Sequence, residues 1–198
     1  MNVWYTLFYF IMLIVAKPLF RVKGRGLEKL PDGGALLCAN HSSNWDVALI
    51  TAVCGKRAQL HFTPKASMKR IPLLGRLMNL VQVVWIDRDR PSDTAPIKKI
   101  IELLQKGEKV AFFPEGHRIK RDDENAAKSG AIMIASRSAV PIVPVYIPRN
   151  KKLFRKNRII FGDAYTLGRV HGTEARAAAI ETLAGKIKEL GDSAHNEI

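Results

Sequence analysis

The chain has 198 residues, which fits one domain or one domain with a small appendage, and its 47% hydrophobic content is enough for a sizeable core. Thirty-two Lys and Arg residues against eighteen Asp and Glu leave a net charge of +14, which favours anionic partners: lipid headgroups, phosphorylated substrates or nucleic acid. The two cysteines, Cys38 and Cys54, lie in apolar runs without metal-site or disulfide-framework spacing, so we expect no metal, no disulfide scaffold and a reducing compartment.

The amino-terminal segment is apolar. Residues 1–16 carry no charge, and four cations follow them: Lys17, Arg21, Lys23 and Arg25. As a helix this run is about 24 Å long, shorter than the roughly 30 Å hydrocarbon core of a bilayer. A signal peptide carries positive charge first and a small-residue cleavage site after, and this segment has neither. We therefore expect an uncleaved helix that dips into one leaflet or barely spans, on the cytoplasmic side of the cell membrane. The alternative is an amphipathic helix that covers a soluble core.

The remaining elements alternate between short apolar strands and longer amphipathic helices. The pattern predicts strands over 35–39, 59–63, 81–87, 109–113, 143–147 and 158–161. Between and after them it predicts helices over 44–54, 67–80, 92–105, 125–138 and 173–190. Pro72 and Gly75 interrupt the second helix, and the third has Ser92 as N-cap and Gly107 as stop. This order indicates an α/β fold with a mixed, largely parallel sheet covered by helices. We divide the chain into residues 1–25, the membrane-docking helix with its basic flank, and residues 26–198, the main domain.

Two prolines stand in the apolar run over 140–145, Pro141 and Pro144. Proline cannot donate a hydrogen bond to a neighbouring strand, so the run predicts an edge or entry strand instead of a central one. It would supply an apolar wall, suited either to an acyl chain or to simple core packing.

Polar clusters follow directly on three of the predicted strands: Asn40-His41, Asp87-Arg88 and Glu115-Gly116-His117-Arg118. Ligands of such sheets gather beyond the carboxyl ends of the strands. The sequence therefore predicts a site where these three strand ends meet.

His41 and Asp46 are the candidates for proton transfer. On a single helix they would point about 140° apart, but they can meet if His41 lies in the loop and Asp46 in the first helical turn. An imidazole held by a carboxylate could deprotonate an alcohol as it attacks a thioester, with no protein nucleophile. Two alternatives stay open: Ser43-x-x-Asp46 matches a helix capping box, and Ser42 could be a nucleophile, although no Gly-x-Ser-x-Gly elbow is present.

The basic residues divide between binding and solvated roles. Gly116 allows close backbone approach or a positive φ, and Arg118 beyond it offers a planar fork of donors suited to phosphate. Arg88 is the better candidate of the second cluster, and Lys65 could extend the same basic rim. The run over 149–158 holds six cations around Leu153 and Phe154, a pattern that suits an anionic membrane or nucleic acid without deciding between them.

Taken together, these residues resemble the lysophosphatidate (1-acylglycerol-3-phosphate) acyltransferase family, the glycerolipid acyltransferases with a His-x-x-x-x-Asp motif. Four blocks match in order, within about residues 20 to 165: 40–46 as the catalytic block, 84–88 as the block ending in Asp-Arg, 113–118 as the phosphate-binding block and 140–145 as the proline-containing block. Two positions depart from the family pattern. His117 stands where the family has Thr or Ser, and Trp85 where it has Phe, which bears on acceptor identity more than on the type of reaction.

The resemblance implies a division of roles among the site residues. His41 would be the general base and Asp46 its partner, while Arg88, Glu115, Gly116 and Arg118 would bind or position the acceptor phosphate, with Lys65 and His117 as further candidates. The implied reaction moves a fatty acyl group from acyl-CoA or acyl-carrier protein, as co-substrate, to the sn-2 hydroxyl of lysophosphatidic acid, giving phosphatidic acid without metal or cofactor. An anionic phospholipid membrane is the expected partner, and nucleic acid is not. The alternatives are another acceptor, such as glycerol-3-phosphate or a lysophospholipid, or a non-enzymatic basic module.

Overall fold

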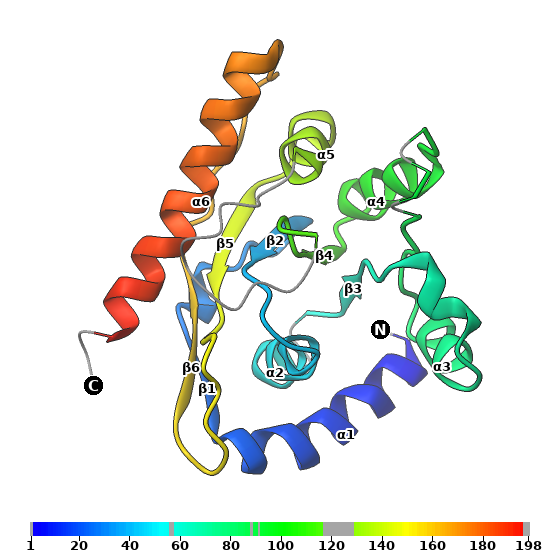
Figure 1. Cartoon of the computed structure of the whole chain (residues 1–198), viewed down its shortest axis with the longest axis vertical. Coiled ribbons are helices and arrows are strands. Elements are labelled where there is room, and N and C mark those ends of the chain that lie inside the picture. Colours follow the sequence, from blue (N-terminus) through cyan, green and yellow to red (C-terminus); the bar gives the residue numbers. More distant parts are fainter. Residues whose placement is uncertain (1, 56–57, 88, 91, 117–128, 196–198) are drawn as a thin grey trace.

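The computed structural model of the chain describes residues 2–55, 58–87, 89–90, 92–116 and 129–195. In chain order its elements are α1 (Val3–Phe20), β1 (Val22–Arg25), η1 (Leu27–Lys29), β2 (Ala35–Ala39), α2 (Trp45–Cys54), β3 (Leu60–Phe62), η3 (Ala66–Arg70), α3 (Leu74–Leu80), α4 (Ala95–Gln105), β4 (Lys109–Phe112), α5 (Gly130–Ser138), β5 (Ile142–Tyr146), β6 (Asn157–Phe161) and α6 (Thr173–His195). Figure 1 shows their arrangement, with α1 lying across one end of the molecule below α2.

The strands form one six-stranded sheet in the order β1-β6-β5-β2-β4-β3. Strands β5, β2, β4 and β3 are parallel to one another, whereas β6 runs antiparallel to β5 and carries β1 beside it. This confirms the predicted mixed, largely parallel sheet covered by helices. Because β2, β4 and β5 point the same way, the segments that follow them emerge at one edge of the sheet.

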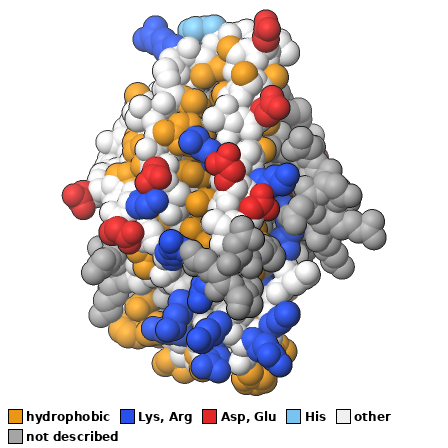
Figure 2. Space-filling view, turned by 90° about the vertical axis from the view of Figure 1, so that its left-hand side faces the viewer, with side chains coloured by type: hydrophobic (Ala, Val, Ile, Leu, Met, Phe, Trp, Pro, Cys, Tyr) orange, Lys and Arg blue, Asp and Glu red, His pale blue; other side chains and the backbone are white. Residues whose placement is uncertain are grey.

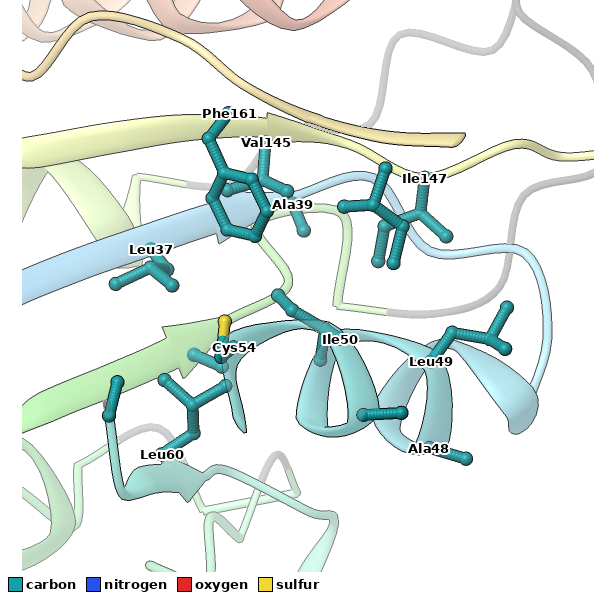
Figure 3. Close-up of a cluster of buried hydrophobic side chains, with 14 of the residues drawn as sticks. Leu37, Ala39, Ala48, Leu49, Ile50, Cys54, Leu60, Val145, Ile147 and Phe161 are labelled. Carbon is teal, nitrogen blue, oxygen red and sulfur yellow. The ribbon is translucent and has the colours of Figure 1, made fainter. Parts of the chain in front are cut away.

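Helices cover both faces of the sheet, so its strands are buried on both sides. Leu37 and Ala39 of β2 face the layer of α1 and α2, and Leu36 and Cys38 face the layer of α4, α5 and α6. Figure 3 shows the first of these layers, where side chains of α2, Ile50 among them, pack against side chains of the central strands. Burial on both sides explains why β2 reads as a continuous apolar run without alternation.

The segment over 81–87 is not a strand, although the sequence predicted one. It follows the end of β3, with Val84 N–H donating to Phe62 O (2.9 Å) and Ile86 N–H donating to Pro64 O (3.0 Å), and it forms only an isolated bridge between Lys65 and Ile86. Pro64 has no N–H to return the bond that a parallel ladder needs at this point. The pairing is therefore interrupted where the prediction expected it to continue.

Strand β5 is central, so the prediction of an edge strand from its prolines was wrong. It lies between β2 and β6, and Pro144 sits within it, opposite Cys38. On its other side, Pro144 O accepts a hydrogen bond from Gly162 N–H (2.8 Å), and a Cβ on Gly162 would lie 2.9 Å from the proline ring. Pro144 therefore lacks its N–H on the side of β6, at a position where β6 has already ended, and Gly162 leaves room for the proline ring.

Several boundaries differ from the predicted ones. Strand β1 was not predicted, although it pairs with β6 along residues of the basic flank. Helix α4 begins at Ala95 with Thr94 as N-cap, not at Ser92, and a proline occupies its first turn. Helix α5 is described from Gly130, and the earlier part of its predicted span includes residues outside the described ones.

Helix α1 is tied to the domain at both ends. At its start, Asn2 bonds Gln59 Oε1 through its backbone N–H (2.8 Å) and Leu80 O through its side chain (3.0 Å). At its end, Leu19 O accepts a hydrogen bond from Phe154 N–H (2.7 Å). Its 18 residues, which include Thr6 and Lys17 among apolar side chains, are enough by length and composition for a membrane span, and it is the one helix of this kind among the described residues.

Candidate active site

His41 and Asp46 are in contact at the carboxyl end of β2. His41 lies in the loop that follows β2, and Asp46 lies in the first turn of α2. The imidazole Nδ1 is 2.8 Å from Oδ2 of Asp46, with the carboxylate fully buried and 17% of the histidine side chain exposed. The structure confirms the predicted geometry of this pair, while the catalytic roles stay predictions.

Asp46 also organises the loop that carries His41. Its Oδ2 accepts hydrogen bonds from the backbone N–H groups of Ser42 and Ser43, each at 2.8 Å. The Ser43 hydroxyl in turn accepts a hydrogen bond from Trp45 N–H at 3.1 Å. Half of the predicted capping box is therefore present: Asp46 accepts the Ser43 N–H, but the Ser43 hydroxyl bonds Trp45 N–H instead of Asp46 N–H, and Asn44 is the N-cap residue. The same oxygen of Asp46 accepts from the loop and contacts His41.

Glu115 follows β4 and forms hydrogen bonds with the segments that follow β2 and β5. Its Oε2 accepts the backbone N–H of His41 (3.0 Å), and its Oε1 accepts from Arg149 Nη2 (3.1 Å). Alongside, the side-chain amide of Asn40 exchanges two hydrogen bonds with the backbone of Ile147, at 2.8 and 2.7 Å. The carboxylate of Glu115 is thus engaged by the segments after β2 and β5, which makes it a residue that positions His41.

Lys151 extends into the site from the loop between β5 and β6. Its ammonium lies 2.6 Å from Oδ1 of Asp46, as an ion pair, and donates a hydrogen bond to Ser42 Oγ at 2.7 Å. Only 5% of the lysine side chain is exposed. The Ser42 hydroxyl is consequently bonded to Lys151, and its other contact is a long one to Arg149 O (3.4 Å), so neither contact joins it to the His41 ring as a serine nucleophile requires.

The two buried carboxyl groups are shifted in opposite directions. Burial alone raises the pKa of Asp46, but the hydrogen bond from His41 and the charge of Lys151 outweigh burial and lower that pKa below its usual value. For Glu115, burial dominates over the His41 N–H and Arg149, and its pKa is raised. Asp46 is therefore ionised near neutral pH and accepts hydrogen bonds, so Nδ1 of His41 is the donor in this contact, and in the neutral form of the ring Nε2 carries the lone pair.

The ring of His41 is held in a fixed plane with one nitrogen left over. It stacks on Phe113, with 4.2 Å between ring centroids and 24° between planes. No hydrogen bond from the described residues reaches its Nε2. A positioned imidazole with a free basic nitrogen can take a proton from an alcohol placed against it.

Of the other predicted site residues, three lie outside the described part of the chain and two lie within it. Arg88, His117 and Arg118 lie outside the described residues. Gly116 is described and has φ 72°, so the positive φ is present of the two roles that the sequence left open for it. Lys65 pairs with Asp89 at 3.1 Å, and none of its described contacts is with His41 or Asp46.

Sequence reasoning missed Arg149 and Lys151 as site residues, because it placed them in a basic surface run. Both residues are more than 100 positions from His41 in the sequence, and they come near it only because β5 lies beside β2 in the centre of the sheet. The prolines of β5 had led us to predict an edge strand instead. Asn40, at the end of β2, was the available signal, since a buried amide there needs partners from a neighbouring strand. Over the described part of the chain, no three His, Cys, Asp or Glu side chains come together as metal ligands.

Comparison with known proteins gives consistent matches. A family model described as Acyltransferase matches residues 21–148. The 1-acyl-sn-glycerol-3-phosphate acyltransferase of Bacillus subtilis is 30% identical over 178 residues, which cover 85% of this chain and 87% of that protein. A chloroplastic enzyme of the same name from Arabidopsis thaliana is 34% identical over 139 residues, but the match covers only 38% of its length. The crystal structure of a 1-acyl-sn-glycerophosphate acyltransferase from Thermotoga maritima shares the fold, with a TM-score of 0.64 at 20% identity over 96% of both chains.

Proposed function

The chain belongs to the acyltransferase family, and from that premise we propose that it transfers a fatty acyl group from an acyl thioester to the sn-2 hydroxyl of lysophosphatidic acid, giving phosphatidic acid. The observation that carries the proposal is the 2.8 Å contact between His41 Nδ1 and Asp46 Oδ2. The other ring nitrogen, Nε2, has no hydrogen bond to any described residue. The names of the relatives support lysophosphatidic acid as the acceptor, and the geometry of the pair supports His41 as the base.

The proposed reaction needs one base and no covalent enzyme intermediate. Nε2 of His41 takes the proton of the acceptor hydroxyl as its oxygen forms a bond to the thioester carbonyl carbon. The carbon–sulfur bond then breaks, and the leaving thiolate takes up from Nε2 the proton that came from the acceptor hydroxyl. Asp46 holds the ring and stabilises its charged form during the interval when the proton is on His41.

Recognition of the acceptor is proposed to depend on cationic side chains. Arg88 and Arg118 are proposed to bind the phosphate, with Gly116 at the turn before Arg118 and His117 and Lys65 as further contributors. Glu115 is given a positioning role, because its carboxylate is engaged by His41 N–H and Arg149. The acyl donor is proposed to be acyl-CoA or acyl-carrier protein, as a co-substrate, with no bound cofactor.

We also propose that the protein works at the cytoplasmic face of the cell membrane, where the acceptor and product reside. Seven large apolar side chains of α1 are at least 39% exposed: Val3, Trp4, Leu7, Phe10, Ile11, Ile14 and Val15. Because both ends of α1 are tied to the domain, this helix suits lying in the interface of one leaflet better than crossing the bilayer.

A matrix of donors and acceptors tests the proposal directly. Purified protein in detergent is offered oleoyl-CoA or oleoyl-carrier protein together with lysophosphatidic acid, glycerol-3-phosphate or lysophosphatidylcholine, and the lipid products are resolved by mass spectrometry. The expected result is phosphatidic acid from lysophosphatidic acid as the dominant product. Preferential acylation of another acceptor would replace the proposed substrate, and the absence of any acyl transfer would contradict the proposed activity.

A further inference from the structure

The loop between β5 and β6 carries two large apolar side chains into solvent. Leu153 is 54% exposed and Phe154 is 68% exposed, and all residues from 152 to 156 are exposed. Phe154 also has φ 57°, a left-handed conformation that is costly for a bulky side chain and persists only where the surroundings impose it. The loop thus holds an aromatic side chain away from the core in a conformation that the residue itself does not favour.

The surroundings that impose this conformation come from the end of α1. Phe154 N–H donates to Leu19 O (2.7 Å), and the buried side-chain amide of Asn157 donates to Phe20 O (2.6 Å). The same amide donates to Lys152 O and Arg155 O, each at 2.9 Å. Carbonyls at the end of a helix lack helical partners, and here the loop supplies them. The loop and α1 therefore form one fixed unit, with the backbone of Phe154 held against the end of the helix.

Cations surround the apolar tip. Lys152, Arg155 and Lys156 are exposed, and no carboxylate of the described residues pairs with any of the three. Figure 2 shows the corresponding segregation on one face of the molecule: Lys and Arg side chains gather at the lower end, where α1 and this loop lie in Figure 1, with hydrophobic side chains at the tip and acidic side chains higher up. An apolar tip with a cationic rim complements an anionic bilayer, with its acyl chains below and its phosphates at the rim.

This unit adjoins the candidate active site from two sides. Lys151, in the same loop, reaches inward to Asp46, while its neighbours Asn150 and Lys152 are exposed. Trp45, directly before Asp46, is 40% exposed and packs on Phe20, with 5.0 Å between ring centroids. A bilayer in contact with the loop would therefore lie close to the His41–Asp46 pair.

We propose that the loop over 152–156 is a second membrane-inserting element, which places Leu153 and Phe154 in the interfacial region of an anionic phospholipid bilayer beside α1 and thereby holds the active site at the lipid surface. The proposal rests on the proposed function in that the acceptor is a membrane lipid. It differs from docking by α1 alone, because it assigns part of the binding to a loop more than 130 residues after α1 in the sequence. The hydrogen bond from Asn157 to Phe20 O joins the two segments in the fold.

Site-specific labelling tests the insertion on the full chain. Cys38 and Cys54 are buried and burial raises the pKa of both thiols, so a single added cysteine is labelled selectively. Phe154→Cys carries an NBD fluorophore, and Lys188→Cys, at an exposed position on α6, is the matched control. With phosphatidylglycerol-containing vesicles, the label at 154 should shift to the blue and be quenched by nitroxide lipids, while the label at 188 should not. Equal, water-like emission at both positions would overturn the proposal, as would a shift that needs only protein self-association or added oligonucleotide.

A kinetic comparison separates this proposal from the proposed function. The double variant Leu153→Ser with Phe154→Ser should lose on the order of tenfold in vesicle binding and in transfer to vesicle-embedded lysophosphatidic acid, with little change toward a short-chain acceptor dissolved as monomers. Unchanged binding and transfer on vesicles would overturn the loop assignment alone. If the wild-type protein acylates neither acceptor, the proposed function fails, and the labelling result still decides the insertion.

Discussion

Lys151 and Asp46 form a buried ion pair, with 2.6 Å between Nζ and Oδ1 and almost no solvent contact on either side chain. The same carboxylate receives His41 and two backbone N–H groups through its other oxygen. One group therefore has a structural role, in satisfying a buried cation, and a proposed catalytic role, in holding the base. Because these roles share one carboxylate, a single substitution at Asp46 disturbs both, and only a combination of variants separates them.

The variants Asp46→Asn, Lys151→Met and their combination make that separation. Each single variant leaves a buried charge without its partner and should reduce the free energy of unfolding by about 3–5 kcal/mol. The double variant removes both charges and should regain much of that loss. Its kcat should stay reduced on the order of 10²–10⁴-fold, because Asn cannot stabilise a protonated His41. Urea unfolding and acyl-transfer rates on the four proteins give the cycle; a double variant that recovers its rate with its stability would show that Asp46 has a structural role only.

The stability contributed by Asp46 should depend on pH in the acid range. Its pKa in the folded protein is lowered, so its contribution is complete above the unfolded value of about 3.9 and is lost as pH falls through the folded value. The difference in unfolding free energy between wild type and Asp46→Asn should therefore be constant above about pH 5 and narrow below about pH 4. Urea denaturation at stepped pH measures it. A difference that widens on acidification would contradict the lowered pKa.

Substitutions at Glu115 distinguish a positioning role from phosphate binding. Glu115→Gln keeps an acceptor for His41 N–H, whereas Glu115→Ala removes it and lets the loop shift. We expect kcat to fall by about 10- to 100-fold in the Ala variant and much less in the Gln variant, since a small displacement of a reacting group is costly. The KM for lysophosphatidic acid should stay near the wild-type value in both. A rise in KM with an unchanged kcat would assign Glu115 to acceptor binding instead.

Gly162 should be required for a proline to sit in the central strand. A Cβ there would lie 2.9 Å from Pro144 Cγ and 3.1 Å from Leu190 Cδ1, so Gly162→Ala should destabilise the protein by about 1–3 kcal/mol. Gly168→Ala is the matched control, because nothing lies within 4 Å of its Cβ position. Thermal unfolding of both variants checks this, and equal melting temperatures would refute the explanation of how Pro144 is accommodated.

The sequence predicted what depends on local pattern. The strand over 35–39 was placed at its observed bounds, and the spacing of His41 and Asp46 across a loop and a helical turn allowed the contact that the structure has. Both features involve residues close together in the chain, where hydrophobic runs and side-chain reach are direct guides.

The sequence did not predict what depends on partners far away in the chain. Pro144 argued for an edge strand, because the glycine that accommodates it lies on a segment whose place in the sheet is not visible in the sequence. The misplaced β5 then hid Lys151, which reaches Asp46 only through the pairing of β5 with β2. The strand expected over 81–87 failed for a related reason, since its neighbour contributes Pro64 at the position where a donor was needed.

The central claim is that His41 takes the proton from the acceptor, and the turnover of His41→Ala tests it most directly. The control is His171→Ala, which removes an exposed histidine just before α6. Transfer from oleoyl-CoA to lysophosphatidic acid is measured on both variants, with thermal unfolding to show that each is folded. The account predicts nearly complete loss of transfer in His41→Ala and wild-type transfer in His171→Ala. Near-normal turnover of a folded His41→Ala protein would contradict it.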